Sequence, residues 1–166
     1  MQTLYLVRHA QAHSGTSYDR DHARELTADG ERDARRLGRF LSATDQIPDR
    51  LVASTAVRAR DTASLLPDGG QWAVDVPLRT ERSLYDGEGE EDVLRAVHAV
   101  DAEAESALLV GHQPTWGDVV RRLAGDARVR LPTGAGVRID VSVDTWTEVA
   151  WGAGVVEWVL PPRLLR

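Results

Sequence analysis

Two side chains that could do chemistry stand together near the start of the chain, at Arg8 and His9. They close a short apolar run over residues 4–10, which is typical of a buried strand. In an open α/β sheet, ligands bind at the carboxyl ends of the strands. A guanidinium and an imidazole there suit an anion and a nucleophile, although the pair could equally be solvated on a loop. Neighbouring strand residues face opposite ways, so both side chains reach one ligand only if the strand ends near Val7 or Arg8.

Two later segments repeat this order of strand, polar terminus and helix. Residues 51–54 form a second apolar run, and Arg58 follows in the first turn of an expected helix, where its charge opposes the helix dipole unless it binds an anion. Residues 106–110 form the most apolar expected strand, and His112 follows it. Parallel strands joined by right-handed crossovers end at one edge of a sheet. We therefore expect His9, Arg58 and His112 to meet in one pocket for a small anion.

The remaining pattern predicts the fold class. Helices are expected where apolar residues recur at three- and four-residue steps: from the N-cap Thr27 to before Ile47, over 55–66 with Thr55 as a possible N-cap, over 92–100, and from 113 to a stop at Gly125. Loops are expected at 11–24, 67–71 and 77–91, a strand at 72–76, and antiparallel strands at 137–143, 145–150 and 155–160. These elements predict an α/β fold of three layers, α/β/α, with a mostly parallel central sheet and antiparallel C-terminal strands.

Composition restricts the class of protein. With 166 residues and 42% of them hydrophobic, the chain suits a single domain spanning 1–166. Its 20 basic and 26 acidic residues give a net charge of −6 without a basic tract, which argues against nucleic acid or an anionic membrane as a partner. The chain has no cysteine, so disulfides and cysteine nucleophiles are excluded. No secretory leader or membrane span is evident, and we expect a cytoplasmic protein.

Three segments, in this order, resemble the motifs of the histidine phosphatase superfamily, also called the phosphoglycerate mutase-like family: 6–10, 54–62 and 110–114. Further segments are similar to its short phosphohistidine phosphatase (SixA) type: 24–30, 131–134 and 158–164. The resemblance covers residues 2–165 and implies a phosphoglycerate mutase-like fold. Thr55 and Ala56 depart from it by replacing a more usual proline-containing segment, which should alter the stiffness of the loop and not the chemistry.

The residue types and the resemblance together assign expected roles. Arg8 and Arg58 offer forked donors that match phosphate. His9 is the expected nucleophile, because neutral imidazole has a free ring nitrogen, and its other nitrogen should donate to a backbone carbonyl. His112 is expected to bind an equatorial oxygen and to be protonated once phosphate binds. Helix N-termini after His9 and His112 should add backbone donors.

A general acid for the leaving group is less clearly marked. Larger members of the family carry a glutamate after the third strand, and Glu81 is the nearest candidate by position, with Asp86 and Glu88 as runners-up. Each of them could equally be an exposed loop carboxylate. The SixA type generally lacks this acid, and a protonated phosphoimidazole needs less help to leave than an alkoxide does.

The leading hypothesis is a metal-independent phosphatase that works through a phosphohistidine intermediate. No metal or cofactor is implied, because the five histidines show no metal-ligand spacing. The substrate would be a phosphorylated protein, above all one that carries phosphohistidine, or a small phosphorylated molecule. The alternatives are a binding module for phosphorylated ligands without turnover, and phosphoglycerate mutase-type phosphoryl transfer, which the short chain disfavours. The sequence predicts neither the exact substrate nor the oligomeric state.

Overall fold

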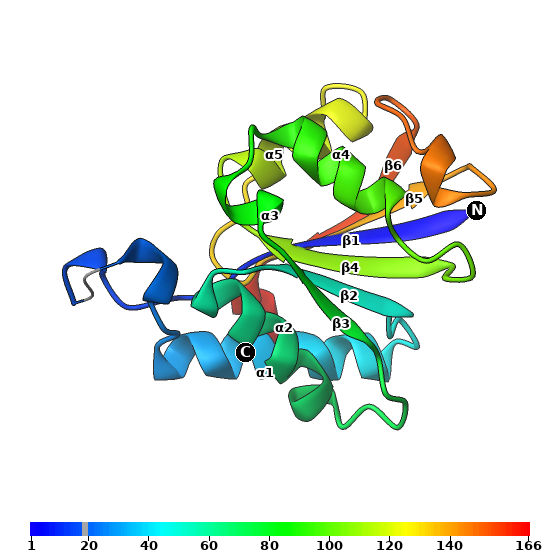
Figure 1. Cartoon of the computed structure of the whole chain (residues 1–166). Helices are drawn as coiled ribbons and strands as arrows, with labels where there is room; N and C mark the ends of the chain where they lie inside the picture. The colour runs from blue at the N-terminus through cyan, green and yellow to red at the C-terminus, as the bar shows by residue number, and fades with distance from the viewer. Residues whose placement is uncertain (18–19) are drawn as a thin grey trace.

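β1 (Gln2–Arg8) lies inside a six-stranded sheet whose order is β3-β2-β4-β1-β5-β6 (Figure 1). The computed structural model of the chain describes residues 1–17 and 20–166. The other strands are β2 (Arg50–Ser54), β3 (Leu78–Glu81), β4 (Ser106–Gly111), β5 (Gly136–Val141) and β6 (Gly154–Leu160). The pairs β1/β4, β4/β2 and β2/β3 are parallel, and β1/β5 and β5/β6 are antiparallel. Because Arg8 pairs with Gly111, β1 and β4 end at the same edge of the sheet.

Helices cover both faces of this sheet (Figure 1). One face carries α1 (Ala28–Ala43) and α2 (Val57–Gly70). The other face carries α3 (Ser83–Asp86), α4 (Glu90–His98) and α5 (Thr115–Leu123). The 3-10 turns are η1 (Gly15–Ser17), η2 (Asp21–Ala23), η3 (Trp146–Glu148) and η4 (Pro162–Leu165). The predicted three-layer α/β/α architecture, mostly parallel with antiparallel C-terminal strands, is thus confirmed.

Side chains along β1 alternate between two hydrophobic cores. Tyr5 and Val7 pack with the α1 and α2 side, and Leu4 and Leu6 pack with the α4 and α5 side. A strand that is buried on both faces has a continuous apolar sequence, so β1 could be predicted from the sequence. No helix in the described part of the chain has both the length and the apolar character needed to cross a membrane.

α1 packs closely against the C-terminal half of α2. As predicted, Thr27 caps α1, because its hydroxyl oxygen accepts a hydrogen bond from the Gly30 amide at 3.0 Å. At Gly38 the two helices approach so closely that a Cβ atom would lie 2.0 Å from the Leu66 carbonyl oxygen. Glycine at this position permits the close approach. The contact helps to position α2, the helix that carries Arg58.

The third parallel strand differs from the prediction. Residues 72–76 do not form a strand, and β3 begins instead at Leu78. Trp72 turns back toward α1, where its indole nitrogen donates to the Gly38 carbonyl at 3.0 Å. β3 is an edge strand with mostly exposed residues, so it lacks the apolar pattern of a buried strand. The expected loop at 67–71 is also wrong, because α2 continues through Pro67 to Gly70.

Three further predictions about the elements are wrong. Residues 145–150 contain the turn η3 in place of a strand, because Thr145 and Glu148 form a capping box and Trp146 is buried. The apolar and polar residues alternate over 145–150 because the large Trp146 side chain is buried beneath this turn. The helix N-terminus expected directly after His9 is wrong as well, since residues 9–14 form an irregular connection. Likewise, Thr55 is not the N-cap of α2, whose N-cap is Ala56.

Candidate active site

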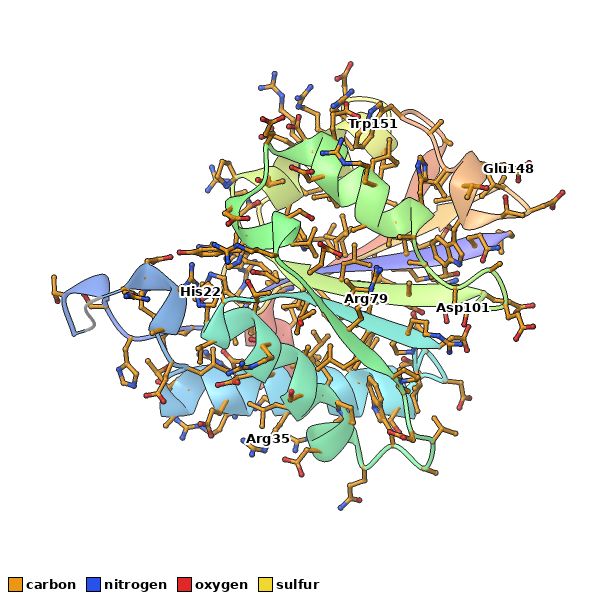
Figure 2. All side chains as sticks on the ribbon, in the orientation of Figure 1. His22, Arg35, Arg79, Asp101, Glu148 and Trp151 are labelled. Atoms are coloured by element: carbon orange, nitrogen blue, oxygen red, sulfur yellow. The ribbon has the colours of Figure 1, made fainter. Side chains whose placement is uncertain are left out.

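A pocket at the carboxyl ends of β1, β2 and β4 brings the predicted site residues together. Its volume is about 560 Å³, and its lining consists of Arg8, His9, Asp21, Arg24, Arg58, Tyr85, Asp86, His112 and Gln113. In Figure 2, His22 lies on the connection at this edge of the sheet, whereas Asp101 lies at the opposite edge. β1 ends at Arg8, so His9 stands outside the strand and both side chains reach the pocket.

His9 presents a lone pair to its neighbours in the pocket. Its Nδ1 lies 2.8 Å from the Ala10 carbonyl oxygen, which can only accept, so Nδ1 carries the proton. Its Nε2 is therefore an acceptor, 3.4 Å from Nε of Arg58. Burial lowers the pKa of His9 to about 4, against the hydrogen bond to Ala10 and with the help of the Arg58 and Arg8 charges. The ring is thus neutral near pH 7.

His112 lies beside His9, and the centroids of the two rings are 5.2 Å apart. Its Nδ1 accepts from Nη2 of Arg58 at 3.5 Å, so its Nε2 donates to the Ser54 hydroxyl at 2.7 Å. Burial, followed by the charges of His9 and Arg58, lowers the pKa of His112 to about 3. His112 is therefore also neutral near pH 7 here, and a phosphate dianion beside it would favour its charged form.

Arg8 approaches the same pocket from the end of β1. Its Nη1 donates to the Leu131 carbonyl oxygen at 3.0 Å. Its Nε is buried and has no hydrogen-bond partner within residues 1–17 and 20–166. Burial lowers the pKa of Arg8, yet a guanidinium keeps its charge near pH 7. A bound oxyanion is one group that could satisfy this donor.

Two buried hydroxyl groups support the site residues, although the sequence pattern assigns them no role: one contacts a site side chain and the other contacts backbone groups. Ser54 holds His112 and accepts from the Ala56 amide at 3.2 Å. Thr62 accepts from the Ala10 amide at 3.0 Å and donates to the Arg58 carbonyl at 2.7 Å. It thereby joins the connection after β1 to α2. Both residues belong to the 54–62 motif, and a polar residue within an expected buried face was the available signal.

Asp21 and Tyr85 also line the pocket, and the sequence reasoning missed both. Asp21 accepts from Arg24 at 3.0 Å, from Arg58 at 3.0 Å and from the Tyr85 hydroxyl at 3.1 Å. Although burial raises the pKa of Asp21, hydrogen bonds from Arg24 and Arg58 lower it to about 2, so the carboxylate is ionised. Both residues lie in expected loops, where spacing does not indicate which side chains meet.

The three candidate general acids lie in different places. Glu81 does not line the pocket as described, and its carboxylate accepts from the Ser83 hydroxyl at 3.2 Å. Asp86 does line the pocket, but it is exposed and accepts from Nε of Arg82 at 2.7 Å. Glu88 is exposed outside the described lining. Of the three candidates, Asp86 is therefore the one that lines the same pocket as the two histidines.

The charges of the pocket suit an anion. Arg8, Arg24 and Arg58 line it, against the carboxylates of Asp21 and Asp86. In the part of the chain that the structure describes, no group of three or more histidine or acidic side chains is placed to hold a metal ion. Guanidinium groups and imidazoles are the available partners for a tetrahedral oxyanion.

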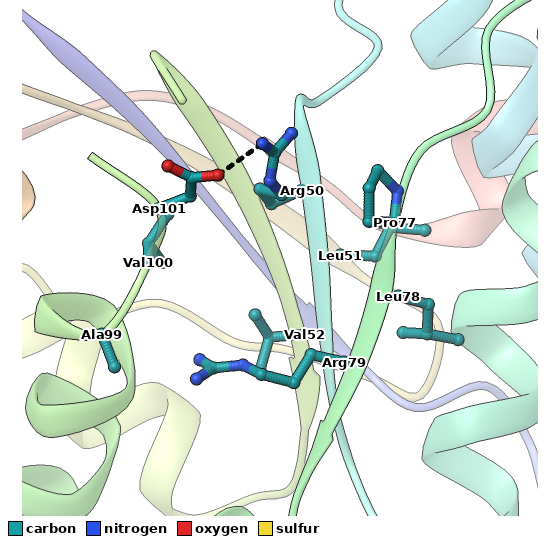
Figure 3. A pocket seen from close by; sticks show the side chains of 9 residues that line it. All are labelled: Arg50, Leu51, Val52, Pro77, Leu78, Arg79, Ala99, Val100 and Asp101. Atoms are coloured by element: carbon teal, nitrogen blue, oxygen red, sulfur yellow. Dashed lines mark hydrogen bonds and ion pairs between the residues drawn. The ribbon is translucent and has the colours of Figure 1, made fainter. Parts of the chain in front are cut away.

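A second pocket, of about 300 Å³, lies between the amino ends of β2 and β3 and the end of α4 (Figure 3). Its polar groups pair within the protein. Arg50 forms an ion pair with Asp101 at 2.6 Å, and Arg79 donates to the Ala96 carbonyl at 3.3 Å. Its described lining includes no histidine, so it offers no nucleophile of the kind found at the other edge of the sheet.

Comparisons with known sequences agree with this geometry. Residues 4–124 match the family model of the histidine phosphatase superfamily (branch 1). An uncharacterized protein from Mycobacterium leprae is 31% identical over 133 residues, which cover 73% of this chain and 78% of that protein. An uncharacterized chloroplastic protein from Arabidopsis thaliana is 25% identical over 163 residues, which cover 95% of this chain and 74% of that protein.

Solved structures share the fold over nearly the whole chain. A candidate phosphohistidine phosphatase SixA from Nakamurella multipartitia has a TM-score of 0.81 and 30% identity, covering 97% of this chain and 96% of that one. The protein histidine phosphatase SixA complexed with tungstate has a TM-score of 0.84 and 21% identity, covering 99% and 100% of the two chains. The resemblance inferred from the motifs is thereby confirmed. The chain belongs to the histidine phosphatase superfamily, and it is a phosphatase.

Proposed function

We propose that this phosphatase hydrolyses phosphohistidine on proteins through a covalent phosphohistidine intermediate at His9. The nucleophile is supported by the state of the ring, in which Nδ1 donates to the Ala10 carbonyl and Nε2 keeps its lone pair. Arg8 and Arg58 would bind the oxygens of the transferred phosphoryl group. His112, beside His9, would add a further donor once the bound dianion favours its protonation.

The reaction would proceed in two displacements at phosphorus. First, Nε2 of His9 attacks, and the bond between phosphorus and the substrate nitrogen breaks with its electron pair going to that nitrogen. A substrate imidazole that carries a proton on its other nitrogen leaves as a neutral ring. Water then attacks phospho-His9, the bond between phosphorus and Nε2 breaks with its electron pair returning to Nε2, and inorganic phosphate leaves with the water oxygen.

The proposed substrate class rests on the ionisation and the hydrogen bonds of the carboxylates around the pocket. Asp21 is ionised, with a pKa of about 2, and is bound to Arg24 and Arg58. Asp86 is bound to Arg82 on the rim. Asp21 is therefore not placed as a protonated acid at neutral pH, whereas an alkoxide leaving group needs such an acid. A phosphorylated imidazole does not, which favours phosphohistidine over an alkyl phosphate. The exposed rim at Asp21 and Asp86 is consistent with a protein substrate.

The test compares two substrates and two histidine variants by the release of inorganic phosphate. Wild-type enzyme should hydrolyse a histidine-phosphorylated protein with a kcat/KM at least about 100-fold above that for an alkyl phosphate. His9→Ala should lose at least about 1,000-fold of this activity. His98→Gln should retain it, because that side chain lies on α4, outside the lining of the pocket, and its Nε2 donates to the Val149 carbonyl at 2.8 Å. Equal use of both substrates would contradict the substrate class, and full turnover by His9→Ala would contradict the nucleophile.

A further inference from the structure

The Arg58 guanidinium presents two edges to two different parts of the pocket. Its Nε and Nη2 face the histidines, at 3.4 Å from Nε2 of His9 and 3.5 Å from Nδ1 of His112. Its Nη1 and Nη2 face the turn η2, where Nη1 donates to the Asp21 carbonyl oxygen at 2.8 Å and Nη2 to the Asp21 carboxylate at 3.0 Å. Asp21 therefore holds the end of the side chain and leaves the edge beside the histidines for a ligand.

We infer that Asp21 is a positioning residue, which orients Arg58 so that its Nε and Nη2 are offered together to the transferred phosphoryl group. Two parallel N–H groups on one guanidinium edge match two oxygens of a phosphate. A free arginine side chain has many rotamers, and fixing it costs conformational entropy. Because Asp21 already holds the Arg58 side chain, less conformational entropy is lost when the phosphoryl group is transferred. The inference rests on the proposed function, because it places the phosphoryl group between His9 and His112.

The Asp21 side chain is itself held on both oxygens. Arg24 donates to Oδ1 at 3.0 Å, and the Tyr85 hydroxyl donates to Oδ2 at 3.1 Å. The Tyr85 ring packs edge-on against His112, with centroids 5.8 Å apart. About half of the Asp21 side chain is exposed, whereas the Arg58 side chain is 7% exposed. A partly exposed carboxylate thus keeps one orientation through contacts to three side chains that line the same pocket.

A competing role for Asp21 predicts an effect of opposite sign. A carboxylate bound to Arg58 could act as an internal anion that phosphate must displace. Removing its charge would then tighten phosphate binding and leave the rate constant unchanged or higher. The contacts favour positioning, because Asp21 takes the Nη1 and Nη2 side of Arg58 and leaves Nε to His9.

The experiment uses the full chain and a graded set of variants. Asp21→Asn removes the charge, Asp21→Ala removes the side chain, and Tyr85→Phe removes only the hydroxyl that holds the carboxylate. Asp68→Asn is the matched control, because Asp68 is an exposed aspartate of α2 that is ion-paired to Arg35 at 2.9 Å. For each variant, kcat and KM are measured on a histidine-phosphorylated protein. Inhibition constants are measured for inorganic phosphate and for orthovanadate, which adopts the five-coordinate geometry of the transition state.

Positioning predicts a loss in kcat that is larger than the change in KM. Asp21→Asn should lower kcat about tenfold, Asp21→Ala more and Tyr85→Phe less, with KM within about threefold of wild type. Vanadate inhibition should weaken more than phosphate inhibition, because orientation matters most in the transition state. Asp68→Asn should match the wild type. In an Arg58→Ala background, Asp21→Asn should have no further effect.

Two results would overturn the inference: an unchanged kcat in Asp21→Asn, or a phosphate inhibition constant that falls in Asp21→Asn while kcat is retained. If Asp21→Ala does not fold, Asp21→Asn and Tyr85→Phe still test the positioning role, because both substitutions keep the shape of the side chain. Arg58→Ala separates this inference from the proposed function. Full activity in Arg58→Ala would contradict the phosphoryl-binding role itself. Impaired Arg58→Ala together with fully active Asp21→Asn would contradict only the positioning role.

Discussion

Single hydrogen bonds set the protonation of the two pocket histidines. The Ala10 carbonyl fixes the proton of His9 on Nδ1. Arg58 donates to Nδ1 of His112, so the His112 proton stays on Nε2, which donates to the Ser54 hydroxyl. The sequence predicts that His9 donates to a backbone carbonyl, and the structure agrees. The role of Ser54 could not be predicted in the same way, because it depends on β2 and β4 lying side by side.

Both histidines are expected to titrate well below the ordinary pKa of 6.5. Ring signals followed by NMR should give midpoints near 4 for His9 and near 3 for His112 in the free protein, because burial penalises the charged imidazole. Between pH 6.5 and about pH 4, the imidazole of His9 binds more protons in the unfolded chain than in the folded one. The free energy of unfolding should therefore fall as the pH falls through this window.

The assignment of these signals comes from variants that lack one ring, His9→Ala and His112→Gln. Inorganic phosphate should raise the midpoint of His112, because a nearby anion favours the charged imidazole. Midpoints near 6.5 for both rings in the free protein would contradict the buried, neutral pair. A His112 midpoint that does not move with saturating phosphate would contradict its place beside the phosphate.

At the scale of the elements, the position of Arg58 depends on how α2 packs against α1. The sequence predicts the start of α1 at Thr27 from local capping chemistry, and this prediction is confirmed. The close approach at Gly38 could not be predicted, because it depends on Leu66 of the other helix. Helix ends follow local rules, whereas helix contacts depend on residues distant in sequence.

Gly38→Ala should lower the free energy of unfolding by about 1–3 kcal/mol, because a Cβ there meets the Leu66 carbonyl oxygen and forces the helices apart. Chemical denaturation measures this change, and kcat/KM should fall with it as the first turn of α2 shifts. Arg39→Ala is the control, since its exposed side chain on the same helix should tolerate truncation. A Gly38→Ala protein with wild-type stability would contradict the role of the close contact.

For the whole molecule, the sequence indicates where the parallel strands end but not what the loops bring to them. β1, β2 and β4 are buried apolar runs, so their polar termini at His9, Arg58 and His112 could be read as one edge of a sheet. The sequence does not indicate β3, because an exposed edge strand has no such pattern. The sequence does not indicate a role for Asp21 either, because only the folded path of its loop brings it to Arg58.

The protein carries a net charge of −6, yet its pocket gathers arginines. This local reversal of charge results from the fold, since Arg8, Arg24 and Arg58 come from β1, the following loop and α2. An anion that enters the pocket meets donors already held by backbone carbonyls and by Asp21. The fold therefore prepares the charge arrangement that phosphoryl transfer requires.

The most direct test locates the phosphoryl group during turnover. Wild-type enzyme is mixed with a protein radiolabelled on phosphohistidine, quenched in alkali within milliseconds, digested and mapped by mass spectrometry. The label should appear on His9 before inorganic phosphate accumulates, should persist in His98→Gln and should be absent from His9→Ala. Label on His112 in place of His9, or rapid release of phosphate without any labelled enzyme, would contradict the covalent mechanism.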